Sequence, residues 1–275
     1  MATLSEVMQK IFVTLFLSLL FFSCSEQVYE YEEMVRQELK ATNQTMTEVE
    51  IKKWAIYLSK WSEPNFYQAT IEEFKKVDLQ NFPKKNSILF IGSSSIVYWK
   101  TLKEDMFPHE VLNRGFGGAH IAHINNHFSE VVSPYEPKGI VFFCGTNDLA
   151  ALKFTDEVFN DFLIFFKKVK VTLPSTKIFV IGIKPSIARY HLRDKQLIMN
   201  NLIAELAENE KNLIYIDVWD EMLLEDGKAN PNLFVEDGLH MNQNGYRIWK
   251  ELVKPHLDKN FNPNKVNHEE ATPRT

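Results

Sequence analysis

The chain has 275 residues, and 45% of them are hydrophobic, which is enough to bury one sizeable core. This length fits a single α/β domain and requires no second full domain. The formal net charge of −5, without a dense cluster of lysine or arginine, argues against a nucleic-acid-binding protein.

The first segment has the layout of a secretory signal. Ile11–Phe22 is apolar apart from Thr14 and Ser18, and it is too short for a comfortable membrane span. With Lys10 before it and Ser23-Cys24 after it, the segment resembles a bacterial lipoprotein signal, in which cleavage before a cysteine frees a thiol for acylation. We therefore expect residues 1–23 to be removed and Cys24 to carry lipid, which anchors the exported protein in the bacterial cell envelope. A plain signal peptide cut elsewhere is the alternative.

The start codon and the cysteines refine this expectation. Met8 would give the signal a short basic beginning, whereas a start at Met1 adds the acidic Glu6, so we expect Met8 to be the natural start. Cys144 is the only other cysteine and lies in an apolar run, where a buried, hydrophobe-like role is expected. If Cys24 is acylated, no disulfide can form.

The next segment is rich in Glu, Lys and Gln, and its apolar positions are sparse. We interpret residues 24–62 as a spacer that becomes helical toward Ile51–Trp61. Apolar residues at helical spacing predict a first packed helix over Asn65–Val77. The main domain is then expected over residues 63–259, followed by a flexible polar tail at 260–275.

Within the main domain, apolar strand-like runs alternate with amphipathic helical patterns. The predicted strands are Ile88–Ile91, Glu110–Asn113, Gly139–Cys144, Lys177–Ile183 and Leu213–Val218. The clearest helical patterns are Asp156–Val171, Arg193–Glu208 and Asn244–Leu257. This alternation indicates βαβ units and a mainly parallel sheet covered by helices on both faces.

Four of the predicted strands are followed by small or polar residues. These are the run Gly92-Ser93-Ser94-Ser95, the glycine-rich stretch Asn113–Gly118, the run Gly145-Thr146-Asn147-Asp148 and, after a long loop, the pair Asp237 and His240. Ligands bind outside the carboxyl ends of parallel strands, so these residues are expected at one edge of one sheet. The alternative for the serines is that they cap the following helix.

The residue types suit acyl transfer. A serine hydroxyl becomes a good nucleophile when an imidazole accepts its proton, and the imidazole needs a carboxylate to orient it. Asp237 and His240 lie three residues apart, so one loop could supply both groups. Gly118, the amide of Asn147 and the backbone N–H of Ser94 are candidate donors to the oxyanion of a tetrahedral intermediate.

The four blocks resemble those of the SGNH hydrolases, also called the GDSL esterase and lipase family, over Ile88–Trp249. The resemblance places the nucleophile at the second position after Gly92, which is Ser94; Ser93 stands where the family has aspartate. It further implies a flavodoxin-like three-layer sandwich with a five-stranded sheet of order 2-1-3-4-5.

On the same resemblance, the oxyanion residues are Ser94, Gly118 and Asn147, and Asp237 and His240 complete the catalytic triad with Ser94. We therefore expect a serine esterase that hydrolyses carboxylic esters through a Ser-His-Asp triad and an acyl-enzyme, with O-acetyl groups on carbohydrate among its candidate substrates. Small-molecule or polysaccharide esters and, through the N-terminal lipid, the membrane are the expected partners, without cofactor, metal or nucleic acid.

Two alternatives remain at this point. One is a lysophospholipase or thioesterase of the same family. The other is a non-catalytic surface protein that binds acylated glycans. The sequence leaves the acyl length and the oligomeric state undetermined.

Several neighbouring residues have a second interpretation. His120, His123 and His127 could hold a metal, but a solvated or partly packed stripe is the preferred interpretation because no cysteine or carboxylate cluster accompanies them. Asp148 is expected to be a turn or cap residue.

Three aromatic residues near the predicted site, Tyr98, Trp99 and Phe116, could line a substrate wall, although core packing is expected for at least two of them. Lys184 and Arg189 follow the fourth strand. They could meet an anionic or sugar substrate, or be rim charges without function.

Overall fold

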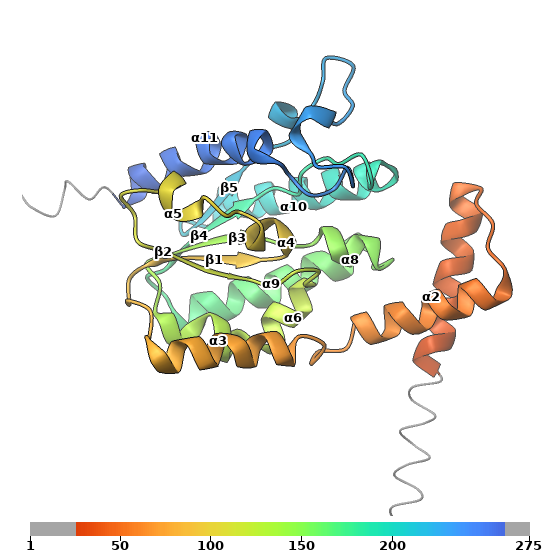
Figure 1. The fold of residues 1–275 in the computed structure, drawn as a ribbon, viewed down its shortest axis with the longest axis horizontal. Helices are drawn as coiled ribbons and strands as arrows, with labels where there is room; N and C mark the ends of the chain where they lie inside the picture. Colours follow the sequence, from red (N-terminus) through yellow and green to blue (C-terminus); the bar gives the residue numbers. More distant parts are fainter. Residues whose placement is uncertain (1–25, 262–275) are drawn as a thin grey trace, which may run out of the picture. The chain divides into compact units, whose positions relative to one another are not determined.

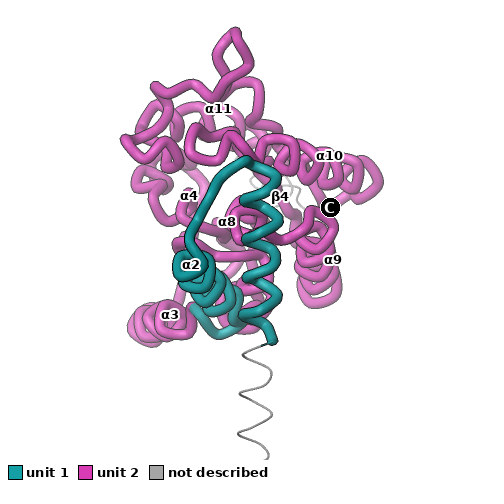
Figure 2. The backbone as a smooth tube through the Cα atoms, turned by 90° about the vertical axis from the view of Figure 1, so that its right-hand side faces the viewer, with its two compact units in different colours: residues 1–66 teal, residues 67–275 magenta. Residues whose placement is uncertain are grey.

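The computed structural model describes residues 26–261, so the predicted signal segment and the lipidation site Cys24 lie outside the described residues. The chain divides into two compact units, residues 1–66 and 67–275 (Figure 2), and each is described by itself. Within residues 26–261, no helix combines the length and apolar composition that crossing a membrane requires.

The described part of the first unit contains two helices, over residues 26–42 and in α2 (Glu48–Trp61). The earlier helix was not expected, because its apolar positions are sparse. Polar contacts join the two helices instead: Arg36 forms two hydrogen bonds with Glu48, of 2.7 and 2.6 Å, and the Tyr31 hydroxyl donates to Ser62 at 2.6 Å. Thr47 and its capping partner three residues later start α2.

The second unit is built on five parallel strands in the order β2-β1-β3-β4-β5, which confirms the predicted fold (Figure 1). The strands are β1 (Ile88–Gly92), β2 (Val111–Gly115), β3 (Gly139–Phe143), β4 (Lys177–Ile181) and β5 (Leu213–Ile216). The helices are α3 (Gln68–Gln80), α4 (Ser94–Val97), α5 (Leu102–Asp105), α6 (Ile121–Asn126), α7 (Phe128–Val131), α8 (Thr146–Ala150), α9 (Thr155–Thr172), α10 (Arg193–Asn209) and α11 (Gln243–Asn260), with short 3-10 turns η1 (Ser133–Tyr135), η2 (Tyr190–Leu192), η3 (Asp220–Met222) and η4 (Pro231–Leu233).

Successive side chains of the buried strands point to opposite faces of the sheet, and this creates two hydrophobic layers. Leu89 and Ile91 of β1 point into one core, which also receives apolar side chains from α3, α9 and α10. Ile88 and Phe90 point into the other, which is covered by α11. Figure 1 shows α3 and α9 on one face of the sheet and α11 on the other. The continuous apolar run of β1 is therefore explained by burial on both faces.

The second strand is longer than predicted. It runs to Gly115, so Arg114 and Gly115, which followed the predicted strand, belong to it and not to a loop. Arg114 is buried, which was unexpected for a charged side chain. Its guanidinium is paired with Asp78 and donates to the Tyr135 hydroxyl at 2.8 Å, and this pairing permits a charged residue inside the sheet.

The order of the strands determines where a ligand can bind. The chain places β2 on one side of β1 and then returns to place β3 on the other side. The direction in which successive strands are added to the sheet therefore reverses between β1 and β3, while all strands remain parallel. Such a reversal leaves a crevice at the carboxyl ends of the two strands. The residues that directly follow β1 and β3 include Ser94 and Asn147.

Candidate active site

Ser94 is presented at a sharp corner between β1 and α4. Gly92 has φ of +149°, and a Cβ atom there would lie 1.9 Å from the carbonyl oxygen of Phe143, so only glycine fits against β3. The backbone N–H of Ser93 then donates to the same carbonyl at 3.0 Å. The corner is thus fixed by close contact between the ends of two neighbouring strands.

The three consecutive serines differ in exposure. Ser93 and Ser95 are buried, whereas Ser94 is partly exposed. The Ser93 side chain makes no capping hydrogen bond to α4, although it occupies the capping position. Helix capping by Ser93 therefore does not explain the run, and Ser94 is the serine that solvent or substrate can reach.

Ser94 and His240 are 146 residues apart in sequence and in hydrogen-bond contact in the structure. Nδ1 of His240 lies 2.5 Å from Oδ2 of Asp237, and a carboxylate only accepts, so Nδ1 is the donor of this pair. Nε2 is then left to accept from the Ser94 hydroxyl, whose oxygen lies 3.0 Å away. An imidazole held in this way can take the proton of a serine hydroxyl.

The carboxylate is held by the loop that carries it. Oδ1 of Asp237 accepts from the backbone N–H groups of Leu239 and His240, both at 2.8 Å. Partial burial by itself would raise the pKa of Asp237, but the hydrogen bonds from the His240 ring and from these two N–H groups outweigh it and lower the pKa to about 2. Asp237 is therefore ionised at neutral pH.

The glycine-rich loop lies beside Ser94. A Cβ atom on Gly117 would be 4.0 Å from the Cβ atom of Ser94, and Gly118 has φ of +81°, in the left-handed region. Nδ2 of Asn147, which is buried in α8, donates to the carbonyl oxygen of Ala119 at 3.0 Å. The structure thus brings the loop that contains Gly118 together with Asn147.

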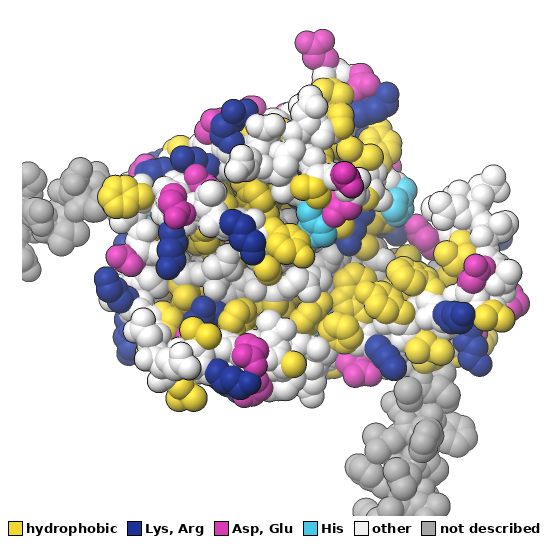
Figure 3. Space-filling view, viewed as in Figure 1, with side chains coloured by type: hydrophobic (Ala, Val, Ile, Leu, Met, Phe, Trp, Pro, Cys, Tyr) yellow, Lys and Arg dark blue, Asp and Glu magenta, His cyan; other side chains and the backbone are white. Residues whose placement is uncertain are grey.

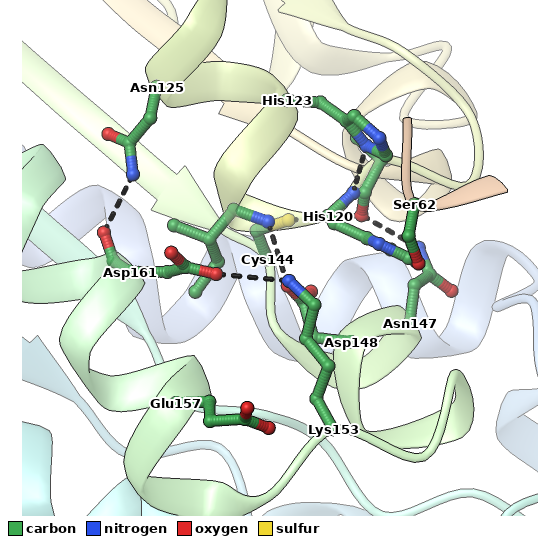
Figure 4. Close-up of polar contacts among 12 residues, drawn as sticks. Ser62, His120, His123, Asn125, Cys144, Asn147, Asp148, Lys153, Glu157 and Asp161 are labelled. Carbon is green, nitrogen blue, oxygen red and sulfur yellow. Dashed lines mark hydrogen bonds and ion pairs between the residues drawn. The ribbon is translucent and has the colours of Figure 1, made fainter. Parts of the chain in front are cut away.

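A buried polar cluster around Asp148 holds the segment that follows the glycine-rich loop (Figure 4). Oδ1 of Asp148 accepts from the backbone N–H of Ile121, the first residue of α6, at 3.0 Å, so Asp148 has the cap role expected of it. Lys153 reaches between Asp148 and Asp161, at 3.6 and 3.0 Å. Burial raises the pKa of Asp148, and the nearby ammonium group opposes that change.

Cys144 is buried, as expected, and it belongs to the same cluster. Its thiol donates to the carbonyl oxygen of Ala119 at 3.1 Å, and burial raises its pKa well above the ordinary value. Thiolates, not thiols, are the nucleophilic form, so this residue has the properties of an inert core cysteine.

The three histidines are not solvated, and that part of their preferred interpretation is wrong. His120, His123 and His127 are all buried, and α6 packs against α9. Burial, with smaller effects of Lys153 and Arg189, lowers the pKa of His120 to about 3. Across residues 26–261, no group of three side chains with metal-ligating chemistry is close enough to hold an ion.

The aromatic residues divide as expected. Trp99 and Phe116 are packed in the two cores, whereas Tyr98 is exposed. The Tyr98 ring stands edge-on to the His240 ring, with centroids 5.0 Å apart. Tyr98 is therefore the aromatic residue of the three that remains available to a substrate.

Lys184 is not a rim charge. It is buried directly after β4, and its Nζ atom donates to the carbonyl oxygen of Leu239 at 2.6 Å. In the same loop, the N–H groups of Ile187 and Ala188 donate to the carbonyl of Gly238 at 2.9 and 3.2 Å. The loop after β4 thus holds the segment between Asp237 and His240. The sequence signal was a lysine at the carboxyl end of a buried strand.

On the face shown in Figure 3, Lys and Arg side chains are interspersed with Asp and Glu and do not gather in one area. This distribution agrees with the absence of a basic cluster in the sequence.

Comparison with known proteins identifies the family. The model of the GDSL-like lipase/acylhydrolase family matches residues 92–248, which span the corner at Ser94, the glycine-rich loop, Asn147 and His240. The chain belongs to this family. It is a serine ester hydrolase of the GDSL type.

Among curated proteins, this GDSL-type hydrolase is similar to an N-acylneuraminate cytidylyltransferase from Escherichia coli O18:K1:H7, with 29% identity over 184 residues. The match covers 63% of this chain and 42% of that protein, so the chain corresponds to less than half of its relative.

Solved structures share the fold of the hydrolase. A protein from Streptococcus pneumonia named for platelet activating factor superposes with a TM-score of 0.64 and 20% identity, covering 77% of this chain and 100% of that one. A GDSL-like lipase from Bacteroides thetaiotaomicron has a TM-score of 0.58 and 20% identity, covering 70% and 98%.

The buried Lys184 predicts a specific dependence of stability on pH. Burial lowers its pKa to about 7, from the ordinary value of 10.5, with a smaller contribution from Arg189. Between these values the unfolded chain binds a proton that the folded chain does not, so the contribution of this group to stability rises with pH. Lys184→Met removes this unfavourable group, so its free energy of unfolding should exceed that of the wild type most at pH 7 and below. The difference between the two proteins should become smaller toward pH 10.

Urea denaturation at a series of pH values measures this difference. Lys177→Met is the matched control, since Lys177 stands at the opposite end of β4 and donates to Asn260 at 2.6 Å. Its difference from the wild type should not change over the same range. A pH-independent difference for Lys184→Met would contradict the depressed pKa.

Proposed function

We propose that the hydrolase works through Ser94 as nucleophile, His240 as general base and Asp237 as the residue that orients the imidazole. The observation that carries the proposal is the continuous hydrogen-bonded chain from the Asp237 carboxylate through His240 to the Ser94 hydroxyl, with distances of 2.5 and 3.0 Å. The partial exposure of Ser94 leaves its hydroxyl accessible to an ester.

In the proposed reaction, Nε2 of His240 takes the proton of Ser94 as Oγ attacks the ester carbonyl carbon. The tetrahedral intermediate collapses, the bond to the alcohol breaks, and His240 gives its proton to the departing alcohol. Water then attacks the acyl-enzyme by the same steps, which releases the carboxylic acid and restores the serine. Asp237 stays ionised throughout and stabilises the imidazolium.

The proposed oxyanion donors are the backbone N–H of Ser94, the backbone N–H of Gly118 and the amide of Asn147. Asn147 uses one of its two N–H groups for the carbonyl of Ala119. The second is the group proposed to serve the substrate, and its direction is set by the first. Donors that are fixed before the reaction stabilise developing charge without reorganisation.

Labelling with a fluorophosphonate tests the nucleophile. The wild type should be labelled at Ser94, and Ser94→Ala should lose labelling and at least about a thousandfold in kcat, since the residues of a triad act as a unit. A non-catalytic protein that binds acylated glycans would not react. Peptide mass spectrometry of the labelled protein locates the adduct.

Ser93→Ala is the matched control. The Ser93 hydroxyl is buried and has no hydrogen-bond partner within residues 26–261, so its loss should leave labelling and turnover near wild type. An adduct on any residue other than Ser94, or full turnover of Ser94→Ala, would refute the assignment.

Asn147→Ala should lower kcat for p-nitrophenyl acetate by about a hundred- to a thousandfold, which is the usual effect of removing one oxyanion donor. Asn125→Ala removes another buried amide, which donates to the carbonyl of Asp161 at 2.8 Å, and should retain wild-type kcat. Steady-state kinetics on both variants, with circular dichroism to verify folding, decides the matter. Full turnover by Asn147→Ala would remove this residue from the mechanism.

We propose O-acetyl groups on carbohydrate as the substrate. Two observations support this: the chain carries a predicted export signal, and the curated relative is named for a sugar, N-acylneuraminate. A lysophospholipase or thioesterase of the same family is the second candidate. Rates on acetyl, butyryl and longer esters separate them, because a carbohydrate acetylesterase should lose activity as the acyl chain lengthens.

We also propose that the mature protein is exported and held in the cell envelope by lipid on Cys24. The full-length wild type, produced in a bacterial host with labelled palmitate, should incorporate label and enter the membrane fraction, whereas Cys24→Ser should do neither. Cys144→Ser is the matched control, because this thiol is buried, and should behave as wild type. An unlabelled, soluble wild type would favour a signal peptide cut elsewhere.

A further inference from the structure

Arg189 is a partly buried cation that has no anionic partner in the described part of the chain. No carboxylate oxygen in residues 26–261 lies within 4.0 Å of its guanidinium, and its one hydrogen bond runs from Nη1 to the hydroxyl oxygen of Thr146, at 3.0 Å. A guanidinium has five N–H donors, so most of its capacity is unused inside the protein. Burial lowers its pKa to about 10, against the attraction of Asp148.

The other arginines of the described chain are either paired or open to water. Arg36, Arg114 and Arg193 have carboxylates within ion-pair distance, from Glu48, Asp78 and Asp194 respectively. Arg247 is exposed. Arg189 alone among residues 26–261 combines partial shielding from water with the lack of a carboxylate, an arrangement that is unfavourable in the absence of a ligand.

Arg189 is located between the two elements that carry the proposed chemistry. Directly before it, the backbone N–H groups of Ile187 and Ala188 donate to the carbonyl of Gly238, in the loop between Asp237 and His240. Its side chain reaches Thr146, the residue before Asn147. The backbone directly before Arg189 is therefore bonded to the loop of the proposed base, and the guanidinium is bonded to the helix of the proposed oxyanion donor.

The charges around Arg189 favour an anion there. Lys184 lies close enough that Arg189 contributes to lowering its pKa, so two basic side chains share this edge of the sheet. The nearest acidic influence is Asp148, and that carboxylate already contacts Lys153. Asp237 acts on Lys184 in the opposite sense to Arg189, so the guanidinium of Arg189 is the group of this edge that an incoming anion would pair with.

We propose that Arg189 binds a carboxylate of the substrate, so that the enzyme acts on O-acylated acidic sugars in preference to neutral ones. The planar guanidinium suits a carboxylate because it can donate two parallel hydrogen bonds. Thr146 positions the side chain, and the carboxylate supplies the missing partner. This inference rests on the proposed esterase function and specifies its substrate class.

A matched pair of substrates tests it: methyl tri-O-acetyl-glucuronoside as the free acid, and the corresponding primary amide, which has the same esters and no charge. Acetate release should give the wild type a kcat/KM at least about tenfold higher for the acid, and Arg189→Gln should bring the ratio of the two values close to one, since a tenfold preference is an ordinary effect of one charged contact.

Two further variants isolate the charge at this position. Arg189→Lys keeps the charge but not the two-pronged geometry, and should retain part of the preference for the acid. Arg193→Gln, four residues along the chain, removes an arginine that contacts Tyr190 at 3.2 Å, and should keep the wild-type ratio. If Arg189→Gln does not fold, the comparison of Arg189→Lys with the wild type still measures the effect.

The outcomes separate this inference from the proposed function. A wild type that hydrolyses p-nitrophenyl acetate and both sugars without preferring the acid would overturn the role of Arg189 and leave the esterase intact. Retention of the preference by Arg189→Gln would overturn it as well. A wild type that releases no acetate from any of these esters would instead overturn the proposed function.

Discussion

The hydrogen bond between Ser94 and His240 is the interaction on which the candidate site depends, because it joins segments that 146 residues separate. Its 3.0 Å length requires that the corner after β1 and the loop before α11 arrive at the same place. Three hydrogen bonds from the loop after β4 hold the loop before α11 in place. The ammonium of Lys184 donates to the carbonyl of Leu239, and two backbone N–H groups donate to the carbonyl of Gly238. The backbone N–H of Val235, which donates to the carbonyl of His240 at 2.9 Å, supports the same loop from within.

The strands of the parallel sheet could be predicted because their signals are local, whereas the order of the strands followed from the resemblance to the SGNH hydrolases. The runs Ile88–Ile91 and Gly139–Cys144 are apolar throughout, and burial on both faces explains this. The length of β2 could not be predicted in the same way. The ion pair with Asp78 stabilises Arg114 inside the strand. Because Asp78 is on a different element, no local sequence pattern could predict that Arg114 belongs to β2.

Burial of polar side chains was the least predictable feature. His120, His123 and His127 were expected to be solvated or partly packed, and Lys184 to meet a substrate or to be a rim charge, but all four are buried. Each depends on partners that are distant in sequence, such as Leu239, 55 residues from Lys184. By contrast, Asp237 and His240 lie within one turn, which made their contact foreseeable from spacing alone. The neighbours of Arg189 likewise come from separate parts of the chain.

The carbonyl oxygen of Ala119 accepts from both the thiol of Cys144 and the amide of Asn147. Since an oxygen atom cannot donate to it, the side-chain amide of Asn147 can have only one orientation about its terminal bond, with nitrogen toward Ala119. The usual ambiguity between amide nitrogen and oxygen does not arise here. The core cysteine and the proposed oxyanion donor therefore share one acceptor atom, so the position of the Ala119 carbonyl governs both side chains.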